Sequence, residues 1–283
     1  MKFKVCSALE YVVNGPSTFI FNIQMARTST QSVMEEHITI DPFFARKEYT
    51  SQDGKTRFIR LQVNDPVTLK ISYAATVDCY YKLIPESNIP HYESVDQLDA
   101  DVIPYIFPSR YCQSDKLQKL ANKRFGHYTN TYQKVLAINE WIYNNVEYLS
   151  GSTNSGTSAI DTLTERAGVC RDFAHLGIAL CRALSIPARY FTGYSYMLTP
   201  QDFHACFEAY IGGEWLIFDP TMLVPLNGLI KIANGRDAAD AALASIFGDT
   251  FGTLVSVSCE CLDYGFQYYD YQANKYKEGM SLE

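Results

Sequence analysis

The stretch "GVCRDFAHLGIALCRAL", Gly168 to Leu184, has the pattern of one buried helix with an unusual first turn. The residues that recur at helical spacing along one face are Phe173, Leu176, Gly177, Leu180 and Leu184. Cys170 lies at the start, where Ser, Thr, Asp or Asn commonly caps a helix. Unpaired backbone N–H groups there favour a thiolate and lower the cysteine pKa from about 8.5. The stretch therefore predicts a reactive cysteine, although a semi-buried cysteine that merely precedes a helix has the same pattern.

A base for this thiol is expected at His204, in "DFHACFEAYIGGEWLIFDPT". Gly212-Gly213 predicts a two-residue hairpin turn, in which Ile211 pairs with Glu214. Alternation then places His204 and Asp219 on the same face of the hairpin. A carboxylate beside an imidazole can fix its tautomer and stabilise its charged form. The alternatives are a half-buried histidine at a strand end and an aspartate that starts a turn.

Three motifs in this order, "GVCRDFAHLGIALCRALSIPARYFTGY", "HACFEAY" and "WLIFDPT", resemble the transglutaminase-like superfamily of papain-type cysteine enzymes. The resemblance covers about Thr131 to Pro225. It implies Cys170 as the nucleophile, His204 as general base and then general acid, and Asp219 as the residue that orients His204. It also implies that a helix N-terminus meets an antiparallel sheet at the site.

Two further features bear on the resemblance. "GRDAADAALASIFG", Gly235 to Gly248, is similar to the tail of the bacterial branch, which has an N-terminal β-sandwich. Many relatives have "HAW" where this chain has "HAC", so Cys206 stands in place of a tryptophan. Cys206 shares the face of His204. We expect it to pack, and the alternative is a roomier site with a second thiol.

The fold class expected is α+β, with an N-terminal antiparallel β-sandwich at residues 1–105 and a transglutaminase-like domain at 106–283. Alternating strands such as "VTLKISYAATV" and turns such as Asp53-Gly54 predict the sandwich. The proline-rich stretch 84–109 predicts a surface linker. Helices are expected at 115–125, 132–146, 158–168, 170–184 and 237–247, and strands at 188–197, 204–211, 214–221 and 253–264.

The composition excludes several classes of function. The chain has 283 residues, a net charge of −7 and a pI of about 5.3, so nucleic acid is not an expected partner. It has no apolar signal-peptide core and no membrane-length apolar run, which predicts a cytoplasmic protein without membrane contact. The eight cysteines are scattered and are expected to be reduced thiols. No motif predicts a metal or another cofactor, and the sequence leaves the oligomeric state open.

Some residues near the motifs have weaker signals. Arg171 and Asp172 are expected to form a salt bridge or to place charge at the helix start, with shaping of the cleft as the alternative. Trp141 is expected in the core rather than at the site. Tyr148 could donate to an oxyanion, but it is one of 21 tyrosines. Cys259 and Cys261 are two soft ligands, which alone rarely make a metal site.

Three functions fit these residues. The first is a cysteine hydrolase that cleaves a peptide or amide bond through an acyl-enzyme, and it is the one that we expect. The second is a protein-glutamine transglutaminase, in which an amine resolves the same acyl-enzyme. The third is a binding module without catalysis, which has no need of all three triad groups. The absence of an acidic calcium loop favours hydrolysis without a metal.

Overall fold

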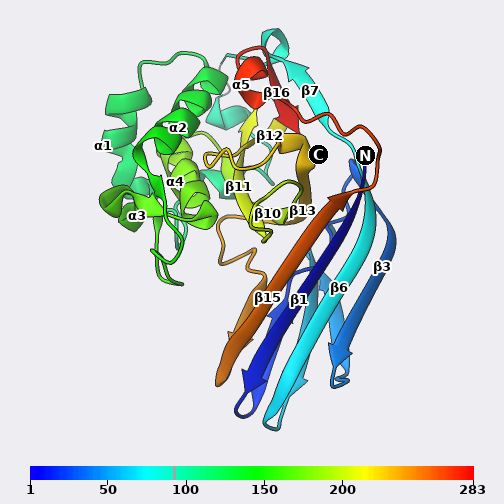
Figure 1. The fold of residues 1–283 in the computed structure, drawn as a ribbon. Coiled ribbons are helices and arrows are strands. Elements are labelled where there is room, and N and C mark those ends of the chain that lie inside the picture. Colours follow the sequence, from blue (N-terminus) through cyan, green and yellow to red (C-terminus); the bar gives the residue numbers. More distant parts are fainter. Residues whose placement is uncertain (92–93) are drawn as a thin grey trace.

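The computed structural model describes residues 1–91 and 94–283 of the chain. Figure 1 shows an elongated sandwich of strands next to a group of helices that lies against a third sheet. The α+β class is therefore confirmed. Within the described residues, no helix is long and apolar enough to cross a membrane.

The sandwich consists of two antiparallel sheets, with strand orders β15-β1-β6-β3 and β14-β2-β5-β4. Its strands are β1 (Lys2–Val13), β2 (Ser17–Phe21), β3 (Gln31–Asp41), β4 (Arg46–Thr50), β5 (Arg57–Val63), β6 (Val67–Cys79), β14 (Ala244–Phe247) and β15 (Thr250–Cys261). The predicted alternation holds in β6, where Leu69 and Ile71 are buried and Lys70 and Ser72 are exposed. Burial of every second residue explains why these segments form strands.

Two strands of the sandwich come from the second half of the chain. Ile246 in β14 pairs with Phe19, and β15 pairs with β1 along its length. The helix expected at 237–247 is wrong, because these residues form a turn followed by β14. The Asp237 carboxylate binds the backbone N–H groups of Tyr111 and Ala239, each at 2.9 Å, and so stabilises a turn instead of a helix. The division of the chain into two domains at residue 105 stays a prediction.

The third sheet is antiparallel and carries the predicted hairpin. Its order is β13-β10-β11-β12-β16-β7, with β7 (Lys82–Pro85), β10 (Ala188–Ser195), β11 (His204–Ile211), β12 (Glu214–Phe218), β13 (Leu229–Gly235) and β16 (Glu278–Ser281). Ile211 pairs with Glu214, as expected. The turn residues Gly212 and Gly213 have φ values of 65° and 82°, a conformation that suits glycine.

The segment expected as a linker begins with strand β7, which pairs with β16 at the edge of the third sheet. Three short 3₁₀ helices follow at Glu86–Asn88, Val95–Gln97 and Ile103–Ile106. Residues 92 and 93 of this stretch lie outside the described residues. The segment expected as a linker therefore adds a strand to the third sheet and does not only lie on the protein surface.

Four of the five helices follow predicted ranges within a few residues, and α5 was not predicted. They are α1 (Ser114–Phe125), α2 (Thr131–Asn145), α3 (Ala159–Glu165), α4 (Cys170–Ala183) and α5 (Tyr271–Asn274), with a further 3₁₀ helix at Leu226–Gly228. Ser158 caps α3, because its backbone N–H and hydroxyl both donate to Asp161. The short strand β8 (Glu147–Tyr148) pairs in parallel with β9 (Ala167–Gly168), which leads directly into α4.

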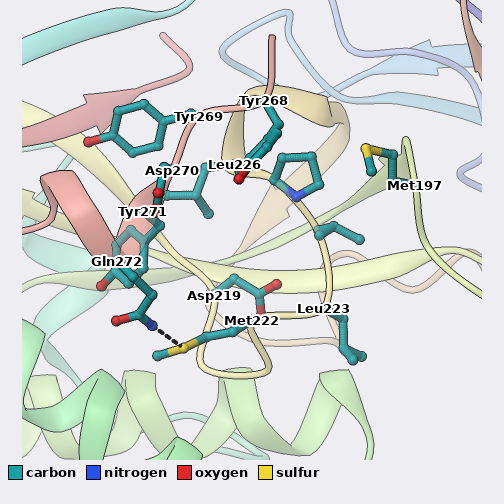
Figure 2. A pocket seen from close by; sticks show the side chains of 12 residues that line it. Met197, Asp219, Met222, Leu223, Leu226, Tyr268, Tyr269, Asp270, Tyr271 and Gln272 are labelled. Atoms are coloured by element: carbon teal, nitrogen blue, oxygen red, sulfur yellow. Dashed lines mark hydrogen bonds between the residues drawn. The ribbon is translucent and has the colours of Figure 1, made fainter. Parts of the chain in front are cut away.

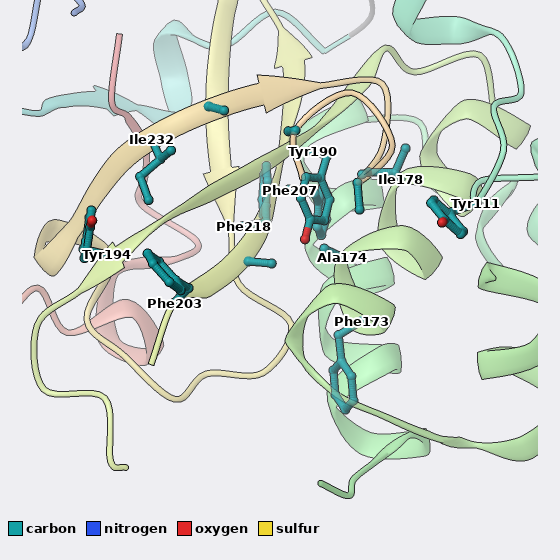
Figure 3. Close-up of a cluster of buried hydrophobic side chains, with 14 of the residues drawn as sticks. Tyr111, Phe173, Ala174, Ile178, Tyr190, Tyr194, Phe203, Phe207, Phe218 and Ile232 are labelled. Atoms are coloured by element: carbon teal, nitrogen blue, oxygen red, sulfur yellow. The ribbon is translucent and has the colours of Figure 1, made fainter. Parts of the chain in front are cut away.

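Helix α4 packs closely on β11. A Cβ atom at Gly177 would lie 2.6 Å from the Phe207 ring, so only glycine allows this approach. Figure 3 shows the interface, with Tyr190 and Phe207 of the sheet beside Ala174 and Ile178 of the helix. This contact holds the start of α4 at a fixed place relative to the start of β11.

We predict that Gly177→Ala lowers the free energy of unfolding by about 1–3 kcal/mol, because the new methyl group overlaps the Phe207 ring. Urea denaturation measures the change. Gly15→Ala is the control, because nothing lies within 4 Å of the added Cβ there. Equal losses in the two variants would contradict the packing described.

A buried ionic network lies between the third sheet and the sandwich. The fully buried Glu208 carboxylate accepts from Arg189 at 2.6 Å and from Lys231 at 2.9 Å. Glu283 contacts the same two cations, each at 2.8 Å. Gln31, at the start of β3, bonds to both backbone groups of Lys231, each at 2.8 Å. Charge pairing and these hydrogen bonds therefore connect β3 to β10, β11 and β13.

This network predicts an acid sensitivity. Burial by itself would raise the pKa of Glu283, but Lys231 and Arg189 outweigh it and lower the pKa. A carboxylate with a lowered folded pKa stabilises the fold above its unfolded pKa, about 4.3, and loses this effect as the pH falls. We expect Glu283→Gln to lower the free energy of unfolding at pH 7 and to flatten its decrease toward pH 4. Urea titrations at several pH values test this, and an unchanged slope would contradict it.

Candidate active site

Cys170 is the first residue of α4, as the sequence predicts, and its side chain is partly exposed. Val169 before it is extended, and Asp172 accepts the Val169 N–H at 2.9 Å. Gly168 makes this possible, because a Cβ there would lie 2.8 Å from the Asp172 Cβ. The helix start is thus fixed, with Cys170 beside the unpaired N–H groups of the first turn.

His204 and Asp219 form a buried pair. His204 is the first residue of β11, Asp219 follows β12, and the predicted hairpin places both on one face. The Nε2 atom of His204 lies 2.9 Å from Oδ2 of Asp219. The other carboxylate oxygen accepts from the backbone N–H of Thr221 at 2.9 Å and from its hydroxyl at 2.7 Å. Asp219 is therefore held in position to orient the imidazole.

The charge of Asp219 changes the protonation of His204. Burial, the largest effect, favours the neutral ring, but the charge of Asp219 and its hydrogen bond, with a smaller effect of the nearby Cys170, raise the His204 pKa well above its ordinary value. The Nδ1 atom of His204 is buried and has no hydrogen-bond partner among the described residues. Asp219 binds Nε2, so Nδ1 is the nitrogen that is left for proton exchange with a thiol. The three residues expected from sequence thus lie within interaction range of one another. Their catalytic roles stay predictions.

Tyr148 is the residue at the site that the sequence ranked too low. The β8–β9 pairing brings it next to the start of α4, with its side chain 44% exposed. Burial, and then the charge of the neighbouring Cys170, raise the Tyr148 pKa to about 12. A phenol that stays protonated beside the thiol can donate to a developing oxyanion. No spacing rule in the sequence reveals a parallel pair of two-residue strands.

Cys206 lies behind the pair rather than at the surface. It is fully buried in an apolar cluster with Phe191, Ile217 and Val224. Burial raises its pKa to about 12, so it is a neutral thiol at ordinary pH. This agrees with packing, the expected role, and not with a second exposed nucleophile.

The donor atoms of His204, Cys206 and Asp219 lie within 4.8 Å of one another and are of types that bind zinc. A metal would need the Cys206 thiolate, which the raised pKa of this buried thiol opposes. It would also compete with Asp219 for Nε2. The donor set therefore suits an orienting hydrogen bond better than a metal, and Cys259 and Cys261 lie elsewhere, in β15.

Other residues near the motifs have mainly structural contacts. Arg171 lies 3.5 Å from Asp172, which fits the expected salt bridge. Trp141 of α2 packs edge-on against Phe125 of α1 and is partly buried at the edge of the core. His175 is fully buried, and its Nε2 accepts the Ala238 N–H at 3.1 Å. His175 is thus hydrogen-bonded to the Ala238 backbone and does not act as a base for Cys170.

An apolar pocket of about 300 Å³ adjoins Asp219. Figure 2 shows Met222 and Leu223 on one side and Tyr268, Tyr269 and the segment up to Gln272 on the other. Gln272 Nε2 lies 2.8 Å from the sulfur of Met222. The pocket has the shape and chemistry to hold an apolar group near the His204–Asp219 pair.

The comparisons with known proteins agree with this geometry. Residues 1–101 match the family described as bacterial transglutaminase, N-terminal domain, and residues 118–220 match the transglutaminase-like superfamily. The chain belongs to the transglutaminase-like superfamily. The resemblance stated from the motifs is therefore confirmed.

One solved structure matches along nearly the whole chain. It is the crystal structure of a "putative cysteine protease" from Cytophaga hutchinsonii, with 59% identity and a TM-score of 0.97, covering 100% of this chain and 98% of that one. The uncharacterized protein ML0607 of Mycobacterium leprae is 25% identical and covers 92% of this chain and 98% of its own length. The uncharacterized protein Mb2599c of Mycobacterium bovis is 31% identical over 141 residues, 44% of this chain and 45% of its own.

The His204–Asp219 contact predicts a shift that is measurable by NMR. Asp219→Asn removes the negative charge, so the imidazole should lose its proton at a lower pH than in the original chain. The ¹⁵N signals of the His204 ring, followed against pH, report this. Asp240→Asn is the control, since Asp240 pairs with the exposed Arg236. Identical titrations of His204 in the original chain and Asp219→Asn would contradict the pairing.

Proposed function

We propose that this chain is a cysteine hydrolase that cleaves a peptide or amide bond through an acyl-enzyme. The observation that carries the proposal is the position of Cys170 at the start of α4, close enough to His204 to affect its protonation, with Nε2 of His204 held 2.9 Å from the Asp219 carboxylate. A nucleophile beside a base that a third group orients is the arrangement required for covalent acyl transfer. Membership of the transglutaminase-like superfamily supports this reading.

The reaction follows from these groups. The Cys170 thiolate attacks the carbonyl carbon, and the carbonyl π electrons move to the oxygen. The protonated His204 gives its proton to the leaving amine as the C–N bond breaks, which leaves a thioester. The neutral His204 then takes a proton from water, whose oxygen attacks the thioester. Collapse releases the carboxylic acid and returns the thiolate with His204 protonated.

Two groups are placed to stabilise the oxyanion. The backbone N–H of Cys170 points from the helix N-terminus, where the helix dipole favours negative charge. The Tyr148 phenol interacts with the thiol from β8. Donors fixed before the reaction stabilise the charge that develops in it.

The Cytophaga hutchinsonii protein supports hydrolysis as the outcome. It is described as a "putative cysteine protease", and it shares 59% identity with this chain over nearly its full length. At that identity the two sites should perform the same class of chemistry. Transfer of the acyl group to an amine is the second outcome of the same thioester, and the experiment below separates the two.

The test is digestion of a mixed peptide library by the purified chain, read by mass spectrometry with and without an added primary amine. We expect new carboxyl termini, and Cys170→Ala should lower the cleavage rate by at least about 10³-fold. Cys261→Ala is the matched control, because this cysteine lies in β15 away from the site. Amine-labelled products without cleavage would replace hydrolysis by acyl transfer. Equal rates with Cys170→Ala would contradict both.

Tyr148 has its own prediction. Tyr148→Phe should lower kcat by about 10²-fold and leave KM nearly unchanged, because the phenol acts on the oxyanion rather than on the bound substrate. Steady-state kinetics on a library-derived peptide measures this. Tyr143→Phe, at an exposed tyrosine of α2, is the control. A change in KM alone would assign Tyr148 to substrate binding instead.

A further inference from the structure

A second pocket, of about 570 Å³, lies at the start of α4 and extends to the sandwich. It is lined by the first turn of α4, by β10, and by the segment that includes β14. The lining residues that matter are Arg110, Tyr111, Arg171, Thr192, Ala238 and Ser245. We call it the arginine pocket.

Tyr111 forms a fixed platform for two cations. The guanidinium carbons of Arg110 and Arg171 lie 5.0 and 5.5 Å from the centre of its ring. The ring itself is held, because it stacks on His175 at 5.0 Å and its hydroxyl donates to the Ser155 carbonyl at 2.8 Å. The positions of the two arginines are therefore set by a rigid aromatic group.

No carboxylate lines the arginine pocket within the described residues. Asp237, close to it in sequence, has its oxygens bound by the backbone N–H groups of Tyr111 and Ala239. Asp240 is paired with Arg236. A protein of net charge −7 thus has a pocket whose ionic side chains are positive.

The two arginines have donors to spare. Within the described chain, no carboxylate oxygen lies within 4.0 Å of Arg110, which is exposed. Arg171 donates to the Asn154 carbonyl and contacts Asp172 at 3.5 Å, but its Nε is buried with no partner among the described residues. A guanidinium with free N–H groups binds a carboxylate in a forked geometry.

The arginine pocket lies near Cys170, at the start of the same helix. Arg171 follows Cys170 directly. Tyr190 also lines the pocket, and the pKa of its phenol is raised first by burial and then by the nearby Cys170. A substrate bound across the thiol can therefore place a side chain in the pocket.

We propose that the arginine pocket binds a carboxylate of the substrate and makes the site selective for an acidic peptide. This rests on the proposed function, and it names the substrate class of that site. The small side chains of the alanines at 238, 239, 241 and 242 leave room for a glutamate-sized group, and Arg110 and Arg171 supply the counter-charge.

Three alkylating probes test the proposal without requiring turnover. They are bromoacetyl-glutamate amide, bromoacetyl-glutamine amide and bromoacetyl-glutamine with a free carboxyl terminus. Rates at Cys170 are read by peptide mass spectrometry and divided by the rates at Cys261 in the same sample. We expect a charged probe to react about tenfold faster than the neutral one, because a charge-assisted contact is added. A faster reaction of the glutamate amide would show that the pocket binds a side-chain carboxylate. A faster reaction of the free-terminus probe would show that it binds a terminal carboxylate.

The double variant Arg110→Gln/Arg171→Gln should remove this preference, and high salt should reduce it. The ratio of charged to neutral probe cancels any change in Cys170 reactivity, so a purely structural role of the arginines would not alter it. Arg60→Gln is the matched control, since Arg60 of β5 likewise lies over a tyrosine ring, that of Tyr49. Equal rates of all probes in the original chain, or a preference that survives the double variant, would overturn the proposal.

A second measurement keeps the two proposals separate. Acetyl-glutamate amide should raise the melting temperature of the Cys170→Ala chain more than acetyl-glutamine amide does, and the arginine variants should lose this difference. Charge preference without peptide cleavage would refute the hydrolase and keep the carboxylate pocket. Cleavage with no preference for acidic peptides would refute the pocket and keep the hydrolase.

Discussion

The close contact of α4 with β11 is the constraint on which the site depends. Gly177 lets the helix lie against Phe207, and Cys170 is seven residues earlier on the same rigid helix, about 10 Å along its axis. His204 is at the start of β11, the strand on which the helix packs. A change in the helix–sheet distance would therefore move the thiol away from the imidazole without altering either residue.

Burial sets the electrostatics at this junction. His204 and Asp219 are almost fully buried, so their interaction is not screened by water. The cost of burying the carboxylate is offset because both of its oxygens accept hydrogen bonds. Cys206, in place of an aromatic residue, fills the space behind the pair as a neutral thiol. The result is an imidazole with a raised pKa next to a thiol at a helix N-terminus.

Much of this site could be predicted from the sequence because its determinants are local. The helix start at Cys170, the two-glycine turn and the strand alternation of the hairpin each depend on neighbouring residues, and together they place His204 beside Asp219. The position of Tyr148 depends instead on β8 pairing with β9, a contact between short segments without a periodic pattern.

The fold shows the same division between local and distant effects. The alternating strands of the sandwich were predictable from their own residues, whereas its edge strands β14 and β15 come from the far end of the chain. The alanine-rich segment before β14 has helical propensity, but Asp237 fixes a turn and Ile246 pairs with Phe19. Tertiary contacts thus overrode propensity there. The segment that leads into β14 also forms one wall of the arginine pocket, so the sequence did not reveal this pocket.

The most direct test of the account is the rate of Cys170 alkylation by iodoacetamide between pH 4 and 9, read peptide by peptide with the other cysteines as internal references. A thiolate paired with His204 predicts fast alkylation already at the acidic end, where ordinary thiols are unreactive. His204→Ala should slow the alkylation of Cys170 at acidic pH to the rate of the reference cysteines. A Cys170 that reacts no faster than the other cysteines at acidic pH, at a rate that His204→Ala leaves unchanged, would contradict the thiolate–imidazolium pair.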